Sequence, residues 1–470
     1  MIEDLKPYAE YKDSGLPWLG QVPGHWTVLP AFGAFKPNKA RNNGMKEKTV
    51  LSLSYGRIVI KPAEKLHGLV PESFETYQIV DPGDIVLRTT DLQNDHTSLR
   101  VGMVRDRGII TSAYLALRCL SGVGPDYGFQ FLNVWDSSKA IYGYGSGLRQ
   151  NLDFSHFKRM PIPIPPPAEQ AAIVRFLDWA NDRLERTIRA KRKVITLLNE
   201  QKQAIIHRAV TRGLDPSVPL NPSGIPWVGE IPEHWEFRQV RRVALFVTSG
   251  SRGWADYYSD SGLIFIQSGN LGRNMALNFH YIQHVQPPSG SEGERTRVLT
   301  DDLLICITGA LTGNVVHVDV DLPGPSFVNQ HVALVRLGQS VVQSRFLAFS
   351  LRSGIGQSQM KTSEYGGTKQ GLGLGDVKDI YFPLPPRDEQ QKIVVHLDAT
   401  LAVFNSAISR LQRKIDLLRE YRTRLVSDVV TGKLDVREAA TRLPDEELLP
   451  DLAAADDEPD DFAIEEEDDS

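Results

Sequence analysis

Hydrophobic positions recur at helical spacing in two long stretches of the chain. In residues 168–212 the apolar positions follow one another mostly at steps of three and four, at 173, 177, 180, 184, 188, 195, 198, 205 and 209. The positions that lie 220 residues further along, from 393 to 429, are nearly all apolar as well. This spacing places one narrow apolar stripe along a helix. The pattern predicts two long helices, each about 65 Å in length at ~1.5 Å per residue.

Proline and glycine mark where these helices begin and end. The prolines between 161 and 167 end the preceding strand and cannot lie inside a helix. Glu169 and Gln170 then fall in the first turn, where an acidic side chain suits the helix dipole. Gly213 and Gly432 follow the last apolar positions and are predicted to terminate the two helices.

The segments 13–160 and 222–380 have the pattern of mixed strand and loop. Short runs rich in branched apolar residues, bounded by polar or glycine-containing stretches, are typical of strands. The predicted strands are 49–53, 84–87, 114–117, 303–307, 314–318 and 331–335.

Two matches reveal an internal duplication. Residues 14–26 read Ser-Gly-Leu-Pro-Trp-Leu-Gly-Gln-Val-Pro-Gly-His-Trp, and residues 223–235 read Ser-Gly-Ile-Pro-Trp-Val-Gly-Glu-Ile-Pro-Glu-His-Trp. Residues 158–215 also align without gaps onto residues 378–435. The chain therefore contains two copies of one unit.

Between the matched segments the two copies differ almost completely. A faint common skeleton remains, because Asp84 and Arg118 match Asp302 and Arg336 at a shared offset of 218. Helices that stayed alike beside cores that diverged indicate a common assembly with separate targets.

The two helices are predicted to pair with each other. A long helix with one narrow stripe needs a partner of equal length, and copies related by a pseudo-two-fold axis pair antiparallel. The alternative is that each helix packs only on its own domain. The residues predicted to face one another are Ile173, Leu177, Leu184, Ile195 and Leu198 on the first helix, with Phe404, Ile408, Leu411, Ile415 and Leu418 on the second.

The expected fold class is mixed α/β (α+β), with a pseudo-two-fold internal repeat. Two globular domains are separated by two long antiparallel helices that form a coiled coil. The predicted boundaries are 13–167 for the first domain, 168–215 for the first helix, 216–386 for the second domain, 387–436 for the second helix and 437–470 for an acidic disordered tail.

Charge is divided unevenly along the chain. Residues 438–470 hold 15 Asp and Glu against one Arg, which leaves 52 Lys and Arg against 43 Asp and Glu in residues 1–437. A basic body suits a polyanionic partner such as nucleic acid. The chain has no apolar run long enough for a membrane span, no signal-like N-terminus and only two cysteines, so the expected compartment is the cytoplasm with both thiols reduced.

Motifs of nucleic-acid enzymes are missing from the sequence. It contains no GxxxxGK[ST] loop, no strand–turn–glycine fingerprint for an adenosyl cofactor and no Asn/Asp-Pro-Pro-aromatic motif of amino-methyltransferases. The expectation is a non-catalytic protein with no catalytic residues, no cofactor and no metal. A bifunctional enzyme with its own nuclease or methyltransferase domain is the less favoured alternative.

The arrangement of domain, helix, domain, helix resembles the specificity subunit of type I restriction–modification systems. The resemblance covers essentially residues 10–436, and the doubled Pro-Pro-x-x-Glu-Gln start of the long helices is its most specific part. Further motifs are Ile-Pro-Trp-Val-Gly-Glu-Ile-Pro-Glu-His-Trp at 225–235, Phe-Ile-Gln-Ser-Gly-Asn at 265–270, Asn-Gln-His at 329–331 and Pro-Pro-Arg-Asp-Glu-Gln-Gln-Lys-Ile at 385–393.

This resemblance implies two target-recognition domains that read the two halves of an asymmetric site on double-stranded DNA. It also implies two adenine methyltransferase subunits that dock on the helices, together with motor-nuclease restriction subunits. No membrane is involved. The alternative of another class is a coiled-coil scaffold protein without sequence-specific DNA binding.

Glycine-rich loops before each long helix are the first candidates for DNA contact. They read Gly-Ser-Gly-Leu-Arg149-Gln150 and Gly-Gly-Thr-Lys369-Gln370. Arg or Lys can pair with phosphate or guanine, and Gln can pair with adenine. The equally weighted alternative is a tight turn whose Gln bonds its own backbone. Weaker candidates are Arg57, Lys61, Arg88 and Arg100 in the first domain and Arg252, Arg273, Arg295 and Arg297 in the second.

Overall fold

A computed structural model describes residues 5–62, 73–95, 97–146, 150–224, 228–250, 253–272, 274–286, 291–319, 322–338, 342–364 and 371–444. The chain divides into two compact units. Unit 1 comprises Met1–Arg189 and Lys414–Ser470, and unit 2 comprises Ala190–Arg413. Each unit therefore contains one globular mixed α/β body and a segment of both long helices.

The two predicted long helices are present as α4, Pro167–Arg212, and α9, Arg387–Val430. Pro167 is the first residue of α4, and the Pro166 carbonyl accepts the first helical hydrogen bond, from the Glu169 amide at 2.8 Å. Gly213 follows α4 directly with φ 71°, and Gly432 follows α9 with φ 76°. This left-handed conformation suits glycine, so both predicted terminators are confirmed.

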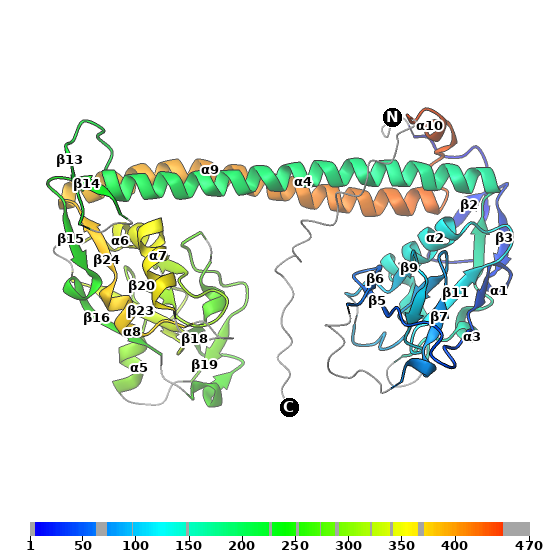
Figure 1. Ribbon diagram of the computed structural model, residues 1–470, viewed down its shortest axis with the longest axis horizontal. Coiled ribbons are helices and arrows are strands. Elements are labelled where there is room, and N and C mark those ends of the chain that lie inside the picture. The colour runs from blue at the N-terminus through cyan, green and yellow to red at the C-terminus, as the bar shows by residue number, and fades with distance from the viewer. Residues whose placement is uncertain are drawn as a thin grey trace. The chain divides into compact units, whose positions relative to one another are not determined.

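Unit 1 is built around a four-stranded antiparallel sheet of order β4-β11-β8-β9 (Figure 1). Helix α2 packs on this sheet against β8, β9 and β11. The elements are β1 Tyr11–Asp13, β2 Gln21–Pro23, β3 Thr27–Pro30, α1 Ala31–Ala34, β4 Phe35–Pro37, β5 Leu51–Ser54, β6 Arg57–Ile60, β7 Gln78–Val80, β8 Ile85–Leu87, β9 Val101–Met103, β10 Gly108–Ile110, β11 Leu115–Cys119, α2 Pro125–Ser137, α3 Phe154–Phe157 and β12 Pro161–Ile164.

Unit 2 has the same central sheet, in the order β16-β23-β20-β21, and adds a second sheet of order β17-β19-β18-β22. Its elements are β13 Leu220–Pro222, β14 Glu230–Pro232, β15 Glu236–Gln239, β16 Ala244–Ser249, β17 Tyr258–Ser259, β18 Leu263–Ile266, β19 Gln283–Val285, α5 Ser291–Thr296, β20 Leu303–Cys306, β21 Val315–His317, β22 Ser326–Val328, β23 Val332–Leu337, α6 Ser344–Arg352, α7 Gly354–Ser363, α8 Leu374–Asp379 and β24 Tyr381–Leu384. All six strand segments predicted from the sequence contain strands.

Within each unit, segments of α4 and α9 lie side by side (Figure 1). In unit 1, Ile173 and Leu177 of α4 share a hydrophobic cluster with Leu425 and Val429 of α9. In unit 2, the end of α4 and the start of α9 share a cluster in the same way, through Ile206, Ala209, Val210, Ile393, Val394 and Leu397. Each pairing joins an early part of one helix to a late part of the other, as an antiparallel arrangement requires.

The predicted disordered tail is wrong in its first part. Residues Arg437–Thr441 form a short helix, α10. Ala439, Ala440 and Leu443 are buried in the hydrophobic cluster of unit 1, so this segment belongs to the folded body despite its acidic neighbours. Residues 445–470 lie outside the described part of the chain.

Candidate nucleic-acid interface

Each unit contains an equivalent ion pair within its own central sheet. Arg118 on β11 donates to Asp84 at 2.8 Å, and Arg336 on β23 donates to Asp302 at 2.6 Å. Both carboxylates are buried. The shared offset of these four residues in the sequence therefore marks one structural element that was kept in both copies.

The doubled Glu-Gln start of the long helices has an anchoring role. Buried Glu169 accepts hydrogen bonds from Tyr8 Oη at 2.6 Å and Trp26 Nε1 at 2.9 Å, and its other oxygen lies 2.7 Å from His25 Nε2. Gln170 accepts from the Gly124 amide at 2.7 Å, just before α2. The start of α4 is thereby tied to the globular body of unit 1.

Unit 2 repeats this anchor with fewer contacts. Glu389 accepts from Trp235 Nε1 at 3.1 Å and lies 2.9 Å from His234 Nε2. Gln390 accepts from the Gln343 amide at 2.9 Å, just before α6. In both repeats, the indole of the His-Trp pair therefore donates to a carboxylate at the start of a long helix.

Three segments of unit 1 converge on one region of the surface. The loop that joins β8 to β9, described at residues 88–95 and 97–100, contacts the segment described at 142–146 and 150–152, because the Leu152 amide donates to Thr89 O at 2.8 Å and the Asp91 amide donates to Asn151 Oδ1 at 3.1 Å. The turn of the β5–β6 hairpin lies against the same loop, since a Cβ added to Gly56 would stand 3.1 Å from Leu99 Cβ. We call these three segments the unit 1 loop cluster.

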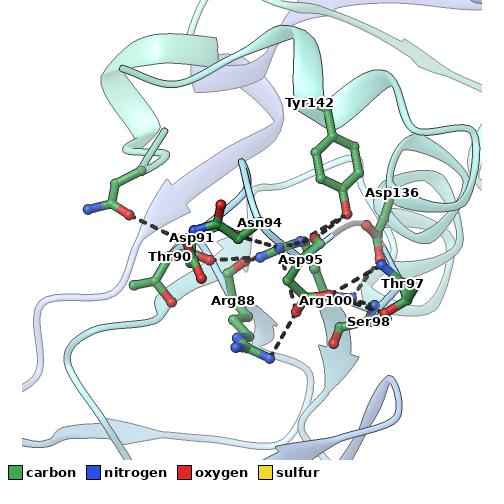
Figure 2. Close-up of polar contacts among 11 residues, drawn as sticks. Arg88, Thr90, Asp91, Asn94, Asp95, Thr97, Ser98, Arg100, Asp136 and Tyr142 are labelled. Atoms are coloured by element: carbon green, nitrogen blue, oxygen red, sulfur yellow. Dashed lines mark hydrogen bonds and ion pairs between the residues drawn. The ribbon is translucent and has the colours of Figure 1, made fainter. Parts of the chain in front are cut away.

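Within the unit 1 loop cluster, Arg100 joins the loop between β8 and β9 to Tyr142 (Figure 2). Its side chain is fully buried. The guanidinium donates to the carbonyls of Thr90 at 2.8 Å and Asp91 at 3.1 Å, and to Tyr142 Oη at 3.2 Å. It also donates to the carbonyls of Arg88 and Asp95. A charged group that donates to so many loop carbonyls fixes the course of the backbone.

Two carboxyl groups complete this network. Burial tends to raise the pKa of Asp95, but hydrogen bonds from Ser98 and Thr97 and the charge of Arg100 lower that pKa to about 2. Asp136 on α2 accepts from the Arg100 amide at 2.7 Å, and burial raises the pKa of its carboxyl above the ordinary value. Asp95 is therefore ionised at neutral pH and supports the loop from within.

The structure separates the predicted DNA-contact residues of unit 1 into two groups. Arg57, Lys61 and Arg88 reach the surface, and Arg88 lies 3.3 Å from Asp95. Arg100 does not reach the surface, so the structure does not support its predicted contact with DNA.

In the Gly-rich loop of unit 1, Gln150 follows the alternative interpretation. The side-chain amide of Gln150, through Nε2, donates to the backbone carbonyls of Tyr142 at 2.6 Å and Tyr144 at 3.0 Å. Gln150 also has a left-handed φ of 47°. Its side chain therefore closes its own turn instead of pointing outward. Arg149 lies outside the described residues.

Unit 2 repeats one link of the unit 1 loop cluster. The Leu372 amide donates to Ile307 O at 2.8 Å, in the position of the bond between Leu152 and Thr89. Thr308 and Gly371 form an isolated bridge beside it. In both units, the segment before the long helix thus contacts the loop that follows an inner strand of the central sheet. That strand is β8 in unit 1 and β20 in unit 2, and the loop sequences differ.

The predicted contacts of unit 2 are only partly described. Arg295 and Arg297 are exposed near the end of α5, and Arg297 lies 3.9 Å from Glu294. Arg252, Arg273, Lys369 and Gln370 lie outside the described residues.

The predicted helix-pair residues all lie on covered faces of the two helices. Ile173, Leu177, Leu184 and Ile415 are buried, and the remaining six are half-buried, namely Ile195, Leu198, Phe404, Ile408, Leu411 and Leu418. Polar contacts accompany the stripe: Arg422 pairs with Glu185 in unit 1, and Lys202 donates to Asn405 at 2.6 Å in unit 2.

A groove beside α4 in unit 1 has a volume of about 1270 Å³. Val123, Val174, Trp179 and Leu443 contribute apolar surface, and Arg175 lines the same groove.

Among the described residues, none of the helices combines the length and apolar character that crossing a bilayer would require.

Comparison with known proteins points to one family. A model of the type I restriction modification DNA specificity domain matches residues 294–417. The putative type I restriction enzyme MjaX specificity subunit of Methanocaldococcus jannaschii is 24% identical over 62% of this chain and 63% of its own length. The EcoBI specificity subunit of Escherichia coli is 21% identical over 63% of this chain and 64% of its own length. The matches therefore span less than two thirds of either relative.

One solved structure has a similar fold. Its description reads "Structural basis underlying complex assembly and conformational transition of the type I R-M system". It superposes with a TM-score of 0.60 at 16% identity, over 88% of this chain and 99% of that one. At this identity, the likeness concerns the fold alone.

Proposed function

We propose, from the premise that this chain belongs to the family of type I restriction–modification DNA specificity subunits, that it reads a bipartite, asymmetric site on double-stranded DNA. Each unit contributes one target-recognition domain, and each domain reads one half-site. The chain itself performs no catalysis and acts as the recognition subunit of a larger complex.

The observation that carries the proposal is the contrast between the shared frameworks and the different loops. Both units have the same order of central strands and the same Asp–Arg pair with a buried carboxylate. Unit 1 adds the β5–β6 hairpin, whereas unit 2 adds the four-stranded sheet that contains β18. Equivalent frameworks present different side chains to the duplex, so the two half-sites are expected to differ in sequence.

The two long helices act as the spacer in this proposal. They pair antiparallel along their length as a coiled coil and relate the domains by a pseudo-two-fold axis. The polar contacts within each unit agree with antiparallel pairing, because Glu185 pairs with Arg422 in unit 1 and Lys202 donates to Asn405 in unit 2. A spacer of fixed length predicts a fixed number of unread base pairs between the half-sites.

Docking of partner subunits is the second part of the proposal. Two methyltransferase subunits bind the helices, and restriction subunits join through them. The groove beside α4 supports this assignment because it exposes apolar side chains next to the helix stripe, as at Val174 and Trp179. Contiguous exposed apolar surface is typical of a protein interface.

The test is a map of methylated adenines. The chain is produced with a methyltransferase subunit in a host that lacks other adenine methylation, and the host genome is sequenced for modified bases. The expected result is methylation at one asymmetric, interrupted sequence. Each subunit expressed alone serves as the control and should give none.

A binding assay separates this function from the scaffold alternative. The complex should bind a duplex that carries the mapped site at least about 1000-fold more tightly than an unrelated duplex at the same salt concentration. Equal affinity for both duplexes, together with the absence of a methylated motif, would favour a coiled-coil scaffold. Methyl transfer by the isolated chain would contradict its assignment as non-catalytic.

A further inference from the structure

The turn of the β5–β6 hairpin contains an unusual residue. Ser54 pairs with Arg57, so Tyr55 and Gly56 form a two-residue turn. Both have positive φ values, 46° for Tyr55 and 76° for Gly56. A turn with two left-handed residues strongly favours Asn followed by Gly. A bulky side chain such as tyrosine is disfavoured in the first position.

Packing does not compensate for this choice. The Tyr55 side chain is 77% exposed, so it gains little from burial in the fold. Val59 and Ile60, which follow in β6, are also exposed, at 43% and 53%. A strained aromatic residue that contributes little to the core is a candidate for a role outside the folded chain.

The hairpin is nonetheless firmly supported at its base. Leu53 and Ile58 lie over Gly102 of β9, where an added Cβ would stand 2.6 Å from Leu53 and 3.0 Å from Ile58. Gly56 lies against Leu99, which directly precedes the anchored Arg100. The turn is therefore presented from a rigid platform within the unit 1 loop cluster.

We propose that the β5–β6 hairpin enters the major groove of DNA and that the Tyr55 ring reads a base pair of the first half-site. This inference rests on the proposed function and names one of its reading residues. The major groove admits a two-stranded β-ribbon, and an apolar ring discriminates by contact with the thymine methyl group. Exposed Arg57 beside the turn supplies a cation for phosphate or guanine.

The decisive variant is Tyr55→Asn in the complex with methyltransferase subunits. Binding is measured at one salt concentration to a duplex that carries the mapped site and to duplexes with single base-pair changes. The variant is expected to lose about 5- to 150-fold of discrimination at one or two adjacent positions of the first half-site. Discrimination in the second half-site should not change.

Stability provides an independent readout. Because Asn suits the turn better than Tyr, Tyr55→Asn should raise the melting temperature by about 2–4 °C. The matched control is Met45→Asn, which replaces another left-handed residue of unit 1, with φ 53°. It should also raise the melting temperature while leaving DNA discrimination as in the wild type. Tyr55→Phe keeps the ring and should retain the discrimination.

The outcomes are distinct. Unchanged discrimination in Tyr55→Asn overturns the inference, as does a uniform loss of affinity for all duplexes. A lower melting temperature shows that Tyr55 supports the fold and also overturns it. If the wild-type complex itself discriminates at neither half-site, the proposed function fails and the inference fails with it.

Discussion

Replacing Arg100 with lysine should loosen the unit 1 loop cluster without removing the charge. The guanidinium donates to five acceptors, and the side chain is fully buried. A lysine ammonium has three donors on one nitrogen, so at least two acceptors lose their partner. Each unpaired buried group costs about 1–3 kcal/mol, so two such groups give an expected loss of about 2–6 kcal/mol.

Arg88→Lys is the matched control in the same loop. The Arg88 side chain is 36% exposed and lies 3.3 Å from Asp95. An ion pair this exposed contributes about 0–1 kcal/mol. The control variant should therefore be close to the wild type in stability.

Denaturant unfolding and amide hydrogen exchange together measure the effect. In Arg100→Lys the amides of the loop that joins β8 to β9 should exchange faster, while the amides of unit 2 keep their wild-type rates. Discrimination in the first half-site should fall because the loop no longer holds its course. The reasoning is refuted if Arg100→Lys and Arg88→Lys have equal stability and equal exchange rates.

Three further predictions concern the anchors, the pH dependence and the helix pair. Glu169→Gln should cost about 2–3 kcal/mol in urea unfolding, and Glu389→Gln about 1 kcal/mol, because an amide cannot accept from all of their donors; equal losses would contradict this ranking. Burial lowers the pKa of His317 against the opposing hydrogen bond with Asp301, so its contribution to stability is present above pH ~6.5 and is lost as the pH falls. His317→Gln should flatten this dependence of the melting temperature, and an unchanged slope would refute the assignment. Half-buried Leu198 changed to Asp should cost about 1–2 kcal/mol in thermal unfolding, whereas Leu197, 49% exposed on the same helix, should tolerate Asp; similar effects at both positions would exclude the predicted stripe.

The regular elements were predictable because their signals are periodic and local. The apolar stripe predicted α4 and α9, and Gly213 and Gly432 predicted where the two helices end. The duplication also singled out the Asp84–Arg118 pair, since a shared offset survives when an ion pair is kept in both copies. Such features depend on spacing along the chain, which the sequence displays directly.

The support within the loops was not predictable in the same way. The sequence did not distinguish Arg100 from Arg57. Only the structure shows that Arg100 is buried, where it contacts loop carbonyls and Tyr142, and that Arg57 is exposed. The Gln150 amide binds carbonyls a few residues before it, an outcome that the sequence left undecided. The short helix α10 was missed because its acidic surroundings mask the small side chains that it buries.

The central claim is that two domains read two half-sites independently. The most direct measurement replaces residues 13–160 with the equivalent domain of a relative and maps methylated adenines in the presence of the methyltransferase subunit. We predict that one half-site changes completely, while the other half-site and the spacer length stay as in the parent. A change in both halves, or a continuous palindromic site in the parent, would contradict the account.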